Sequence, residues 1–220
     1  MKKSKAILMV VCAMLLVAAS VMGTLAYLTS TDEVVNTFSV GKVKITLDEA
    51  KVGEDGKALT GEAAARVKGN NYHLLPGHEY DKDPTVTVKA GSDESYIRMM
   101  VTVTFKNELT DTLLATNLDN IFTGYDATEW IRNDKTVSAD NKTITYEYRY
   151  FETVAGAKNA EGKDINNVLP ALFTGISVPD NYTENEINIL NGMEIAITAE
   201  AIQADGFTDA DDAWDNFPTT

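Results

Sequence analysis

The two histidines of the chain, His73 and His78, are the first residues that raise the question of metal chemistry. They lie five positions apart, with Pro76-Gly77 between them and Glu79 next to the second. A zinc protease site needs two histidines one helical turn apart, with a glutamate between them. Because a Pro-Gly turn would interrupt such a helix, the spacing predicts solvated or hydrogen-bonded histidines and no zinc site.

A cluster of aspartates near the C-terminus is the best metal candidate, because hard oxygen ligands suit calcium. Its members are Asp205, Asp209, Asp211, Asp212 and Asp215. Their spacing does not follow the loop pattern of an EF-hand. Alanines lie among them, and aspartates in the first turn of a helix stabilise it through the helix dipole. The pattern therefore favours an acidic helix start and leaves calcium as the weaker alternative.

The sequence points to no catalytic nucleophile. It has no Gly-x-Ser-x-Gly elbow, and its single cysteine, Cys12, lies in an N-terminal segment that we expect to be removed. Carboxylates are numerous, but nothing singles out a glycosidase pair. The aromatic run Thr143–Phe151 (TITYEYRYF) could bind sugars, yet its alternation predicts that one set of side chains packs in the core. We therefore expect no catalytic residue, no cofactor and no enzymatic activity.

The N-terminus has the three parts of a secretory signal. Lys2, Lys3 and Lys5 precede an apolar run over Ala6–Met22. Thr24-Leu25-Ala26 then places small residues at the positions that a signal peptidase reads. We expect cleavage between Ala26 and Tyr27. The alternative is an uncleaved membrane anchor, for which the apolar run is near the lower limit of length.

Loss of this signal changes the charge and the cysteine content of the mature chain. It takes three of the 19 basic residues and leaves all 33 acidic ones, so the net charge becomes −17 with histidines neutral. Such a charge disfavours nucleic acid and anionic membranes as partners. The mature chain also has no cysteine, and hence no disulfide or thiol chemistry.

Segments that alternate apolar and polar residues recur along the rest of the chain, and this predicts half-buried strands in one antiparallel sandwich domain over residues 39–220. The expected strands are 38–47 (with a phase slip at Gly41), 85–89, 96–105, 128–132, 143–151, 171–178 and 193–203. Short helices are expected at 107–122 and around Trp214, with a helical turn at 62–67. Periodicity alone leaves immunoglobulin-like and jelly-roll wiring open.

Four sequence elements together carry a family resemblance. They are the signal ending in Thr24-Leu25-Ala26-Tyr27, the segment NTFSVG (36–41) before Val43–Leu47, the turn Leu75-Pro76-Gly77 before a strand, and the last strand Met193–Ala201 followed by Gln203. In this order they resemble the TasA/camelysin family of secreted bacterial biofilm-matrix proteins. The resemblance implies a jelly-roll subunit of an extracellular fibre at the cell surface or in the matrix. It also implies export through an ER-type, SipW-like signal peptidase.

The same resemblance implies that the tail Tyr27–Phe38 is a donor strand, which adds to an open sheet edge of a neighbouring subunit. Leu28 and either Val34 or Val35 would be its anchors. We expect a tail too short to fold back, so that it pairs outward and self-association gives fibres. A disordered terminus is the alternative. For the whole protein, the alternatives are a camelysin-type secreted metallopeptidase and a monomeric surface adhesin.

Overall fold

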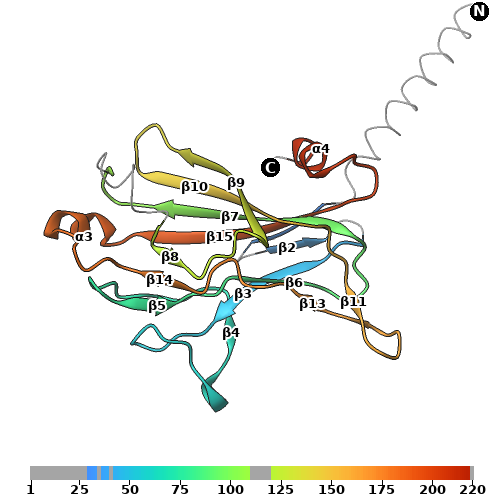
Figure 1. Cartoon of the computed structure of the whole chain (residues 1–220), viewed down its shortest axis with the longest axis horizontal. Coiled ribbons are helices and arrows are strands. Elements are labelled where there is room, and N and C mark those ends of the chain that lie inside the picture. The colour runs from blue at the N-terminus through green and yellow to red at the C-terminus, as the bar shows by residue number, and fades with distance from the viewer. Residues whose placement is uncertain (1–28, 34–35, 40–41, 110–119, 219–220) are drawn as a thin grey trace, which may run out of the picture.

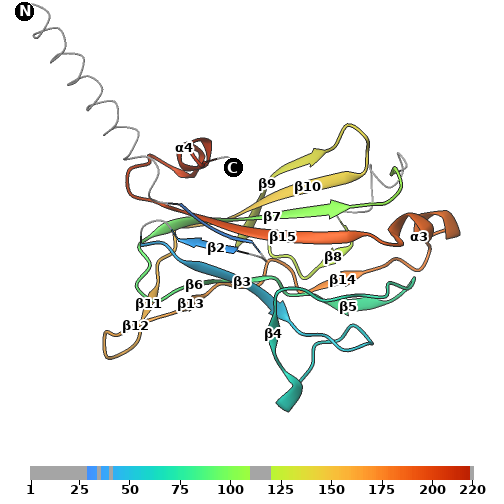
Figure 2. The same ribbon diagram turned by 180° about the vertical axis from the view of Figure 1, so that it is seen from behind.

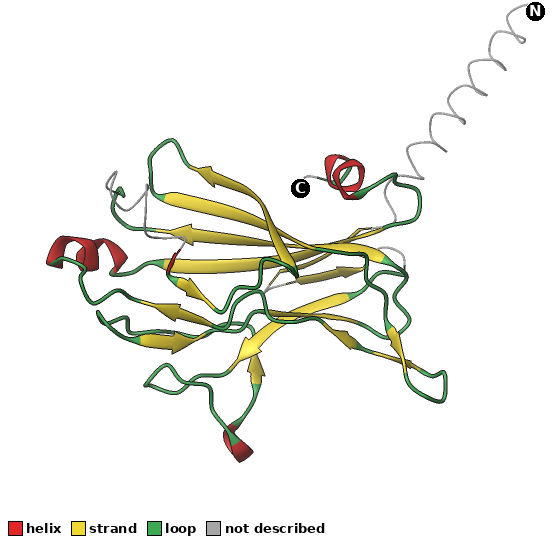
Figure 3. Ribbon diagram, viewed as in Figure 1, coloured by secondary structure: helices red, strands yellow, loops and turns green. Residues whose placement is uncertain are grey.

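The computed structural model describes residues 29–33, 36–39, 42–109 and 120–218. The described chain is an all-β sandwich of antiparallel strands in two layers, with its helices at the periphery (Figures 1 and 3). The predicted fold class is therefore confirmed. The expected signal and cleavage site, Ala26 and Tyr27, lie outside the described residues. Within the described ranges, no helix has the length and apolar character needed to cross a membrane.

The first layer is a six-stranded sheet in the order β2-β1-β15-β7-β10-β9. Its strands are β2 (Asn36–Ser39), β1 (Thr29–Glu33), β15 (Glu194–Gln203), β7 (Ser95–Thr104), β10 (Thr143–Tyr150) and β9 (Trp130–Val137). The three long strands at its centre were expected from their alternation. On β7 every second side chain is buried, from Ser95 to Val103, as half-burial of one sheet face requires.

The second layer consists of two smaller sheets. One has the order β13-β6-β3-β4 and the other the order β5-β14-β8. Their strands are β13 (Asn167–Val168), β6 (Thr85–Val88), β3 (Ile45–Ala50), β4 (Arg66–Val67), β5 (Glu79–Asp81), β14 (Gly175–Ser177) and β8 (Phe122–Thr123). A separate hairpin joins β11 (Ala157–Lys158) to β12 (Asp164–Ile165). The core fills the space between the layers, and Trp130, Tyr146 and Phe173 are among its largest buried side chains.

Several expected elements differ from those observed. The single strand expected over 38–47 is two strands, because β2 pairs with β1 in the first layer and β3 pairs with β6 in the second. The chain therefore changes sheet between Ser39 and Ile45, and Gly41, where the phase slip was expected, lies outside the described residues. Only Gly175–Ser177 of the expected strand 171–178 forms a strand, and β9 runs beyond Arg132 to Val137. The expected turn at 62–67 is a 3-10 helix at Gly61–Ala63 followed by β4.

The helices also depart in part from expectation. Most of the helix expected at 107–122 lies outside the described residues, and its last residue, Phe122, begins β8. The helix around Trp214 is confirmed as α4 (Ala210–Asp215). Sequence analysis missed α3 (Glu184–Leu190), which begins with a capping box between Thr183 and Glu186. A Thr-x-x-Glu spacing before an apolar run is the signal that could have found it.

Helix α4 covers part of the outer face of the six-stranded sheet, at the end opposite α3 (Figure 2). The Arg98 guanidinium carbon lies 4.3 Å from the ring centre of Trp214 and 5.0 Å from that of Phe217. Arg98 Nε also contacts Glu200 Oε2 at 2.6 Å, and Arg149 Nη1 contacts Asp211 Oδ1 at 2.5 Å. Cation–π contacts and ion pairs therefore fix the C-terminal segment on the sheet.

Candidate functional site

Strand β15 is paired along its whole length on one side but only along part of it on the other. On one side β7 pairs with all residues from Glu194 to Gln203. On the other side β1 pairs only with Ala199, Glu200, Ala201 and Ile202. Among the described residues, no strand pairs with 194–198 on that side. This half of β15 is an exposed sheet edge, and such an edge is a template for the addition of another strand.

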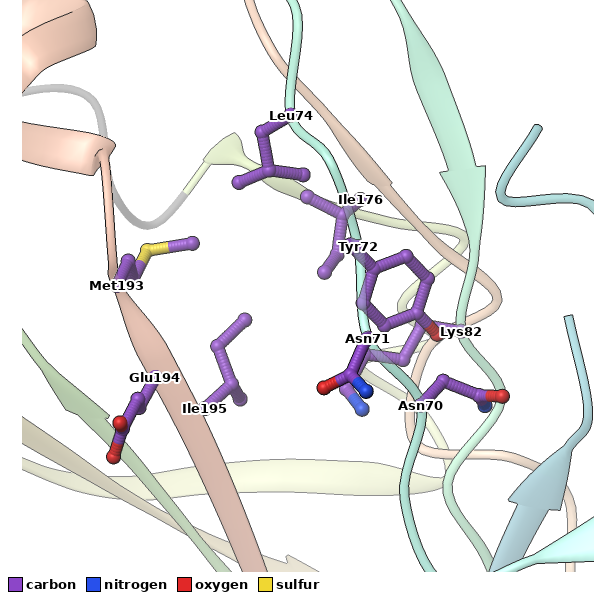
Figure 4. A pocket seen from close by; sticks show the side chains of 9 residues that line it. All are labelled: Asn70, Asn71, Tyr72, Leu74, Lys82, Ile176, Met193, Glu194 and Ile195. Carbon is purple, nitrogen blue, oxygen red and sulfur yellow. The ribbon is translucent and has the colours of Figure 1, made fainter. Parts of the chain in front are cut away.

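A groove runs beside this open half of β15. Its walls are the segment 68–75 and residues 190–197, and Figure 4 shows its central part. Three hollows follow one another along it, with cavity volumes of about 300, 260 and 90 Å³. Met193 lines the first two hollows and Ile195 lines the last two. The hollows therefore follow one another from the segment before β15 to Ile197, beside the open half of the strand.

The inner face of β15 becomes more exposed toward the groove. Ala201 and Ala199 are fully buried and Ile197 is 7% exposed, whereas Ile195 is only half-buried. These residues share one face of one strand, so the difference comes from what covers them. The covering layer is incomplete at the open half of β15. Exposed apolar side chains next to an unpaired edge are what an added strand would bury.

Charged and polar side chains form one side of the central hollow (Figure 4). Lys82 Nζ contacts Glu49 Oε2 at 2.5 Å, and Asn70 Nδ2 donates to Glu49 Oε1 at 2.9 Å. The Tyr72 ring centre lies 5.6 Å from Lys82 Nζ, and its hydroxyl donates to the carbonyl of Asp81. Burial, reinforced by the nearby Glu49 charge, raises the pKa of Tyr72. Within the described chain, these groups bind one another and so hold this wall in place.

The N-terminal tail occupies the remainder of the β15 edge in its own chain. Thr29–Glu33 forms β1 on β15, and Asn36–Ser39 returns as β2 on β1. The expectation that the tail is too short to fold back is therefore wrong. Glu33 and Asn36 are partners in the antiparallel β1–β2 register.

The residues predicted for assembly are only partly placed by the structure. Tyr27, Leu28, Val34 and Val35 lie outside the described residues. Phe38 is opposite Thr31 in the β1–β2 register. The described part of the tail therefore lies beside the covered half of β15, next to the open half.

The aspartate cluster serves the start of α4, as the favoured interpretation had it. Asp209 caps the helix by accepting a hydrogen bond from the Asp212 backbone at 2.9 Å, and Asp212 accepts one from the Thr208 backbone. Asp211 pairs with Arg149, while Asp205 and Asp215 are exposed. Within the described part of the chain, no three His, Cys, Asp or Glu side chains come together in a way that could hold a metal ion. The weaker calcium alternative therefore finds no ligand set in this cluster.

The two histidines lie in the connection that leads into β5. The His73 carbonyl accepts a hydrogen bond from the Tyr80 hydroxyl, and His78 Nδ1 lies 2.9 Å from the Pro76 carbonyl oxygen. Neither lies in a helix.

On β10, Tyr146 and Tyr148 are buried in the core, so the core interpretation of the aromatic run is confirmed.

One outer edge of the six-stranded sheet differs from the open half of β15. Strand β9 forms that edge, and its pairing with β10 is interrupted by a bulge between Glu147 and Tyr148. Arg132, Asp134 and Lys135 lie along it. Bulges and charged side chains are the means by which sheet edges avoid pairing with other chains. Strand addition at β9 is therefore disfavoured.

Comparison of the chain with family models, with curated proteins and with solved structures gives no match in any of the three. The assignment of the open half of β15 and its groove as the candidate site is therefore based on their geometry. Sequence analysis missed the groove, because its walls lie more than a hundred residues apart in the chain and only the fold joins them. The polar Lys82, Glu49 and Asn70 likewise carry no local signal that would group them.

A chain that begins at Ser39 lacks β1 and almost all of β2, so that β15 is open along its whole edge. We expect a peptide of residues 27–38 to bind this chain and to raise its free energy of unfolding by about 2.7 kcal/mol at 100 times the Kd. Denaturant unfolding with and without the peptide measures the change. Equal stabilisation by a scrambled peptide of the same composition would contradict specific strand pairing.

Proposed function

We propose that the mature chain is a non-enzymatic structural subunit of an extracellular bacterial biofilm-matrix fibre. In such a fibre the N-terminal tail of one subunit, Tyr27–Phe38, would add as a strand to β15 of the next. The observation that carries the proposal is the open half of β15 beside a groove of successive hollows. The secretory signal and the resemblance of the N-terminal third and last strand to the TasA/camelysin family support it.

Exchange of the tail between subunits explains how the tail can pair with β15 of its own chain in the monomer and with β15 of the next subunit in the fibre. In the single chain, β1 covers residues 199–202 of its own β15. A subunit that donates its tail therefore uncovers that stretch and joins it to the open stretch 194–198. The incoming tail then meets an edge about twice as long as the one open in the closed chain. The gain in backbone pairing and in apolar burial along the groove favours the exchanged state.

The positions of the donor tail and the acceptor strand also account for the growth of a linear fibre. The donor is at the N-terminus and the acceptor is β15, so the two surfaces are different and the contact is heterologous. Heterologous contacts that do not close into a ring give filaments. The bulged and charged edge at β9 disfavours a second mode of strand addition. One donor and one acceptor per subunit thus produce an unbranched fibre.

The first test compares the mature chain, Tyr27–Thr220, with the truncated chain that begins at Ser39. We expect fibres from the mature chain only, because the truncated chain has an acceptor edge but no donor. Electron microscopy and sedimentation at several pH values and calcium concentrations measure assembly. If the mature chain stays monomeric under all of these conditions, the proposed function is wrong.

A reversible lock on the tail tests the exchange itself. Ser30 and Ala201 are partners in the β1–β15 register, at a separation that suits a disulfide between opposed residues. The mature chain has no other cysteine. We expect the double variant Ser30→Cys/Ala201→Cys to remain monomeric when oxidised and to form fibres on reduction, as measured by sedimentation.

The matched control for this lock is the pair Thr102→Cys/Thr145→Cys. These residues are partners on β7 and β10, two strands that do not move in the exchange. Oxidation of the control pair should leave assembly unchanged. Fibres from the oxidised Ser30/Ala201 variant would show that assembly occurs without release of β1, and the exchange would have to be abandoned.

A charge in the groove should prevent strand addition without unfolding the subunit. Ile195 is half-buried and lines two hollows, so Ile195→Asp places a carboxylate where the added strand would bury it. Each 1.4 kcal/mol of this cost weakens addition about tenfold, and an unpaired buried charge costs several kcal/mol. Fibre yield by sedimentation should therefore fall at least tenfold. Thr104→Asp, an exposed position on the neighbouring strand, is the control and should assemble normally.

A further inference from the structure

Three side chains from separate segments meet in the wall of the groove. Glu49 lies on β3, Asn70 follows β4, and Lys82 lies between β5 and β6. The Glu49 carboxylate contacts both of the others, with Oε2 at 2.5 Å from Lys82 Nζ and Oε1 at 2.9 Å from Asn70 Nδ2. The Lys82 and Glu49 side chains are 7% and 6% exposed. An amine and a bridging carboxylate are thus held out of bulk water, and the carboxamide of the half-buried Asn70 lies against the carboxylate.

The ion pair between Lys82 and Glu49 does not explain why the Asn70 carboxamide is hydrogen-bonded at both its oxygen and its nitrogen. Asn70 Oδ1 accepts a hydrogen bond from the Val52 backbone at 3.0 Å, and Nδ2 also donates to the carbonyl of Ala50 at 2.8 Å. The backbone donor polarises the carboxamide at the oxygen where negative charge would develop if a nucleophile attacked Cγ. The nitrogen that would leave is the atom that contacts Glu49. The carboxamide is therefore oriented for acyl transfer.

We propose that Lys82 and Asn70 form an intramolecular isopeptide bond, with Glu49 as the catalytic proton carrier. Glu49 takes one proton from the Lys82 ammonium, and the free Nζ lone pair forms a bond to Asn70 Cγ. The Cγ–Nδ2 bond then breaks. Nδ2 takes the second Nζ proton and the proton held by Glu49, and it leaves as ammonium. The product is a secondary amide, Glu49 returns to a carboxylate, and no oxidant or reductant is required.

The surroundings of the cluster suit this reaction. The Tyr72 ring centre lies 5.6 Å from Lys82 Nζ, and the ring limits the access of water that would compete for Cγ (Figure 4). The bond would tie the wall segment that follows β4 to the β5–β6 connection. Among the strands that the structure describes, none pairs with that segment across the groove, and the mature chain has no cysteine to form a disulfide that would hold it. A covalent tie would keep the groove open while it is empty.

Mass spectrometry of the purified mature chain tests the proposal directly. We expect the intact mass under denaturing conditions to be lower than the sequence mass by one ammonia. Trypsin should fail to cleave after Lys82, because its amine is in an amide. The expected fragment is a single peptide of residues 69–89 that lacks one ammonia, in place of the separate peptides 69–82 and 83–89.

Substitutions then test the roles of Lys82 as nucleophile, Asn70 as acyl donor and Glu49 as proton carrier. Lys82→Met, Asn70→Ala and Glu49→Gln should each restore the full sequence mass. Asn71→Ala, which alters a neighbour lining the same hollow, should still lose one ammonia. A native chain with the full mass and normal cleavage after Lys82 would overturn the proposal, even if every variant were to misfold. Loss of ammonia within 69–89 in Glu49→Gln would overturn the role of Glu49. Neither result depends on whether the chain forms fibres.

Discussion

Backbone pairing along β15 is the constraint on which the rest of the structure depends. A strand inside a sheet must pair on both sides, or expose a row of donors and acceptors. Strand β7 meets this requirement along one side, but β1 meets it along only part of the other. The half-exposed Ile195, the hollows beside it and the incomplete second layer all follow from this one shortfall. In the described sheet, residues 194–198 of β15 thus have a neighbouring strand on one side only.

The wall opposite that edge resists collapse because its polar groups bind one another. A groove lined only by apolar side chains would tend to close on itself, since closure removes apolar surface from water. Here the contacts of Glu49 with Lys82 and Asn70 would have to be broken for the wall to move inward, and that would leave the buried Glu49 carboxylate without partners. The cost of closing the groove therefore comes from electrostatics, while the benefit of filling it comes from apolar burial.

The alternation of apolar and polar residues predicted the longer, regular strands of this chain. It predicted β6, β7, β10 and β15, because each buries one face and so shows the period in its own residues. It did not find β4, β5, β8 and β13 of the second layer, which are two or three residues long and too short to show a period, whereas β14 lies within the expected strand 171–178. The tail was misjudged for a similar reason: TSTDE pairs through its backbone on β15, and backbone pairing leaves little mark on residue type. The groove joins segments remote in sequence, so no local pattern could place it.

The position of β15 in the chain has a consequence for the time at which the protein can fold. This strand lies between β1 and β7 in space, yet it is the last strand in the sequence. Its contact between Arg98 and Glu200 spans 102 residues. Contacts of such long range are slow to form, and here they cannot begin until residues 194–203 have been made. The pairings of β15 with β1 and β7 therefore form after β15 has been made, whereas β7, β10 and β9, which lie within residues 95–150, can pair with one another before it.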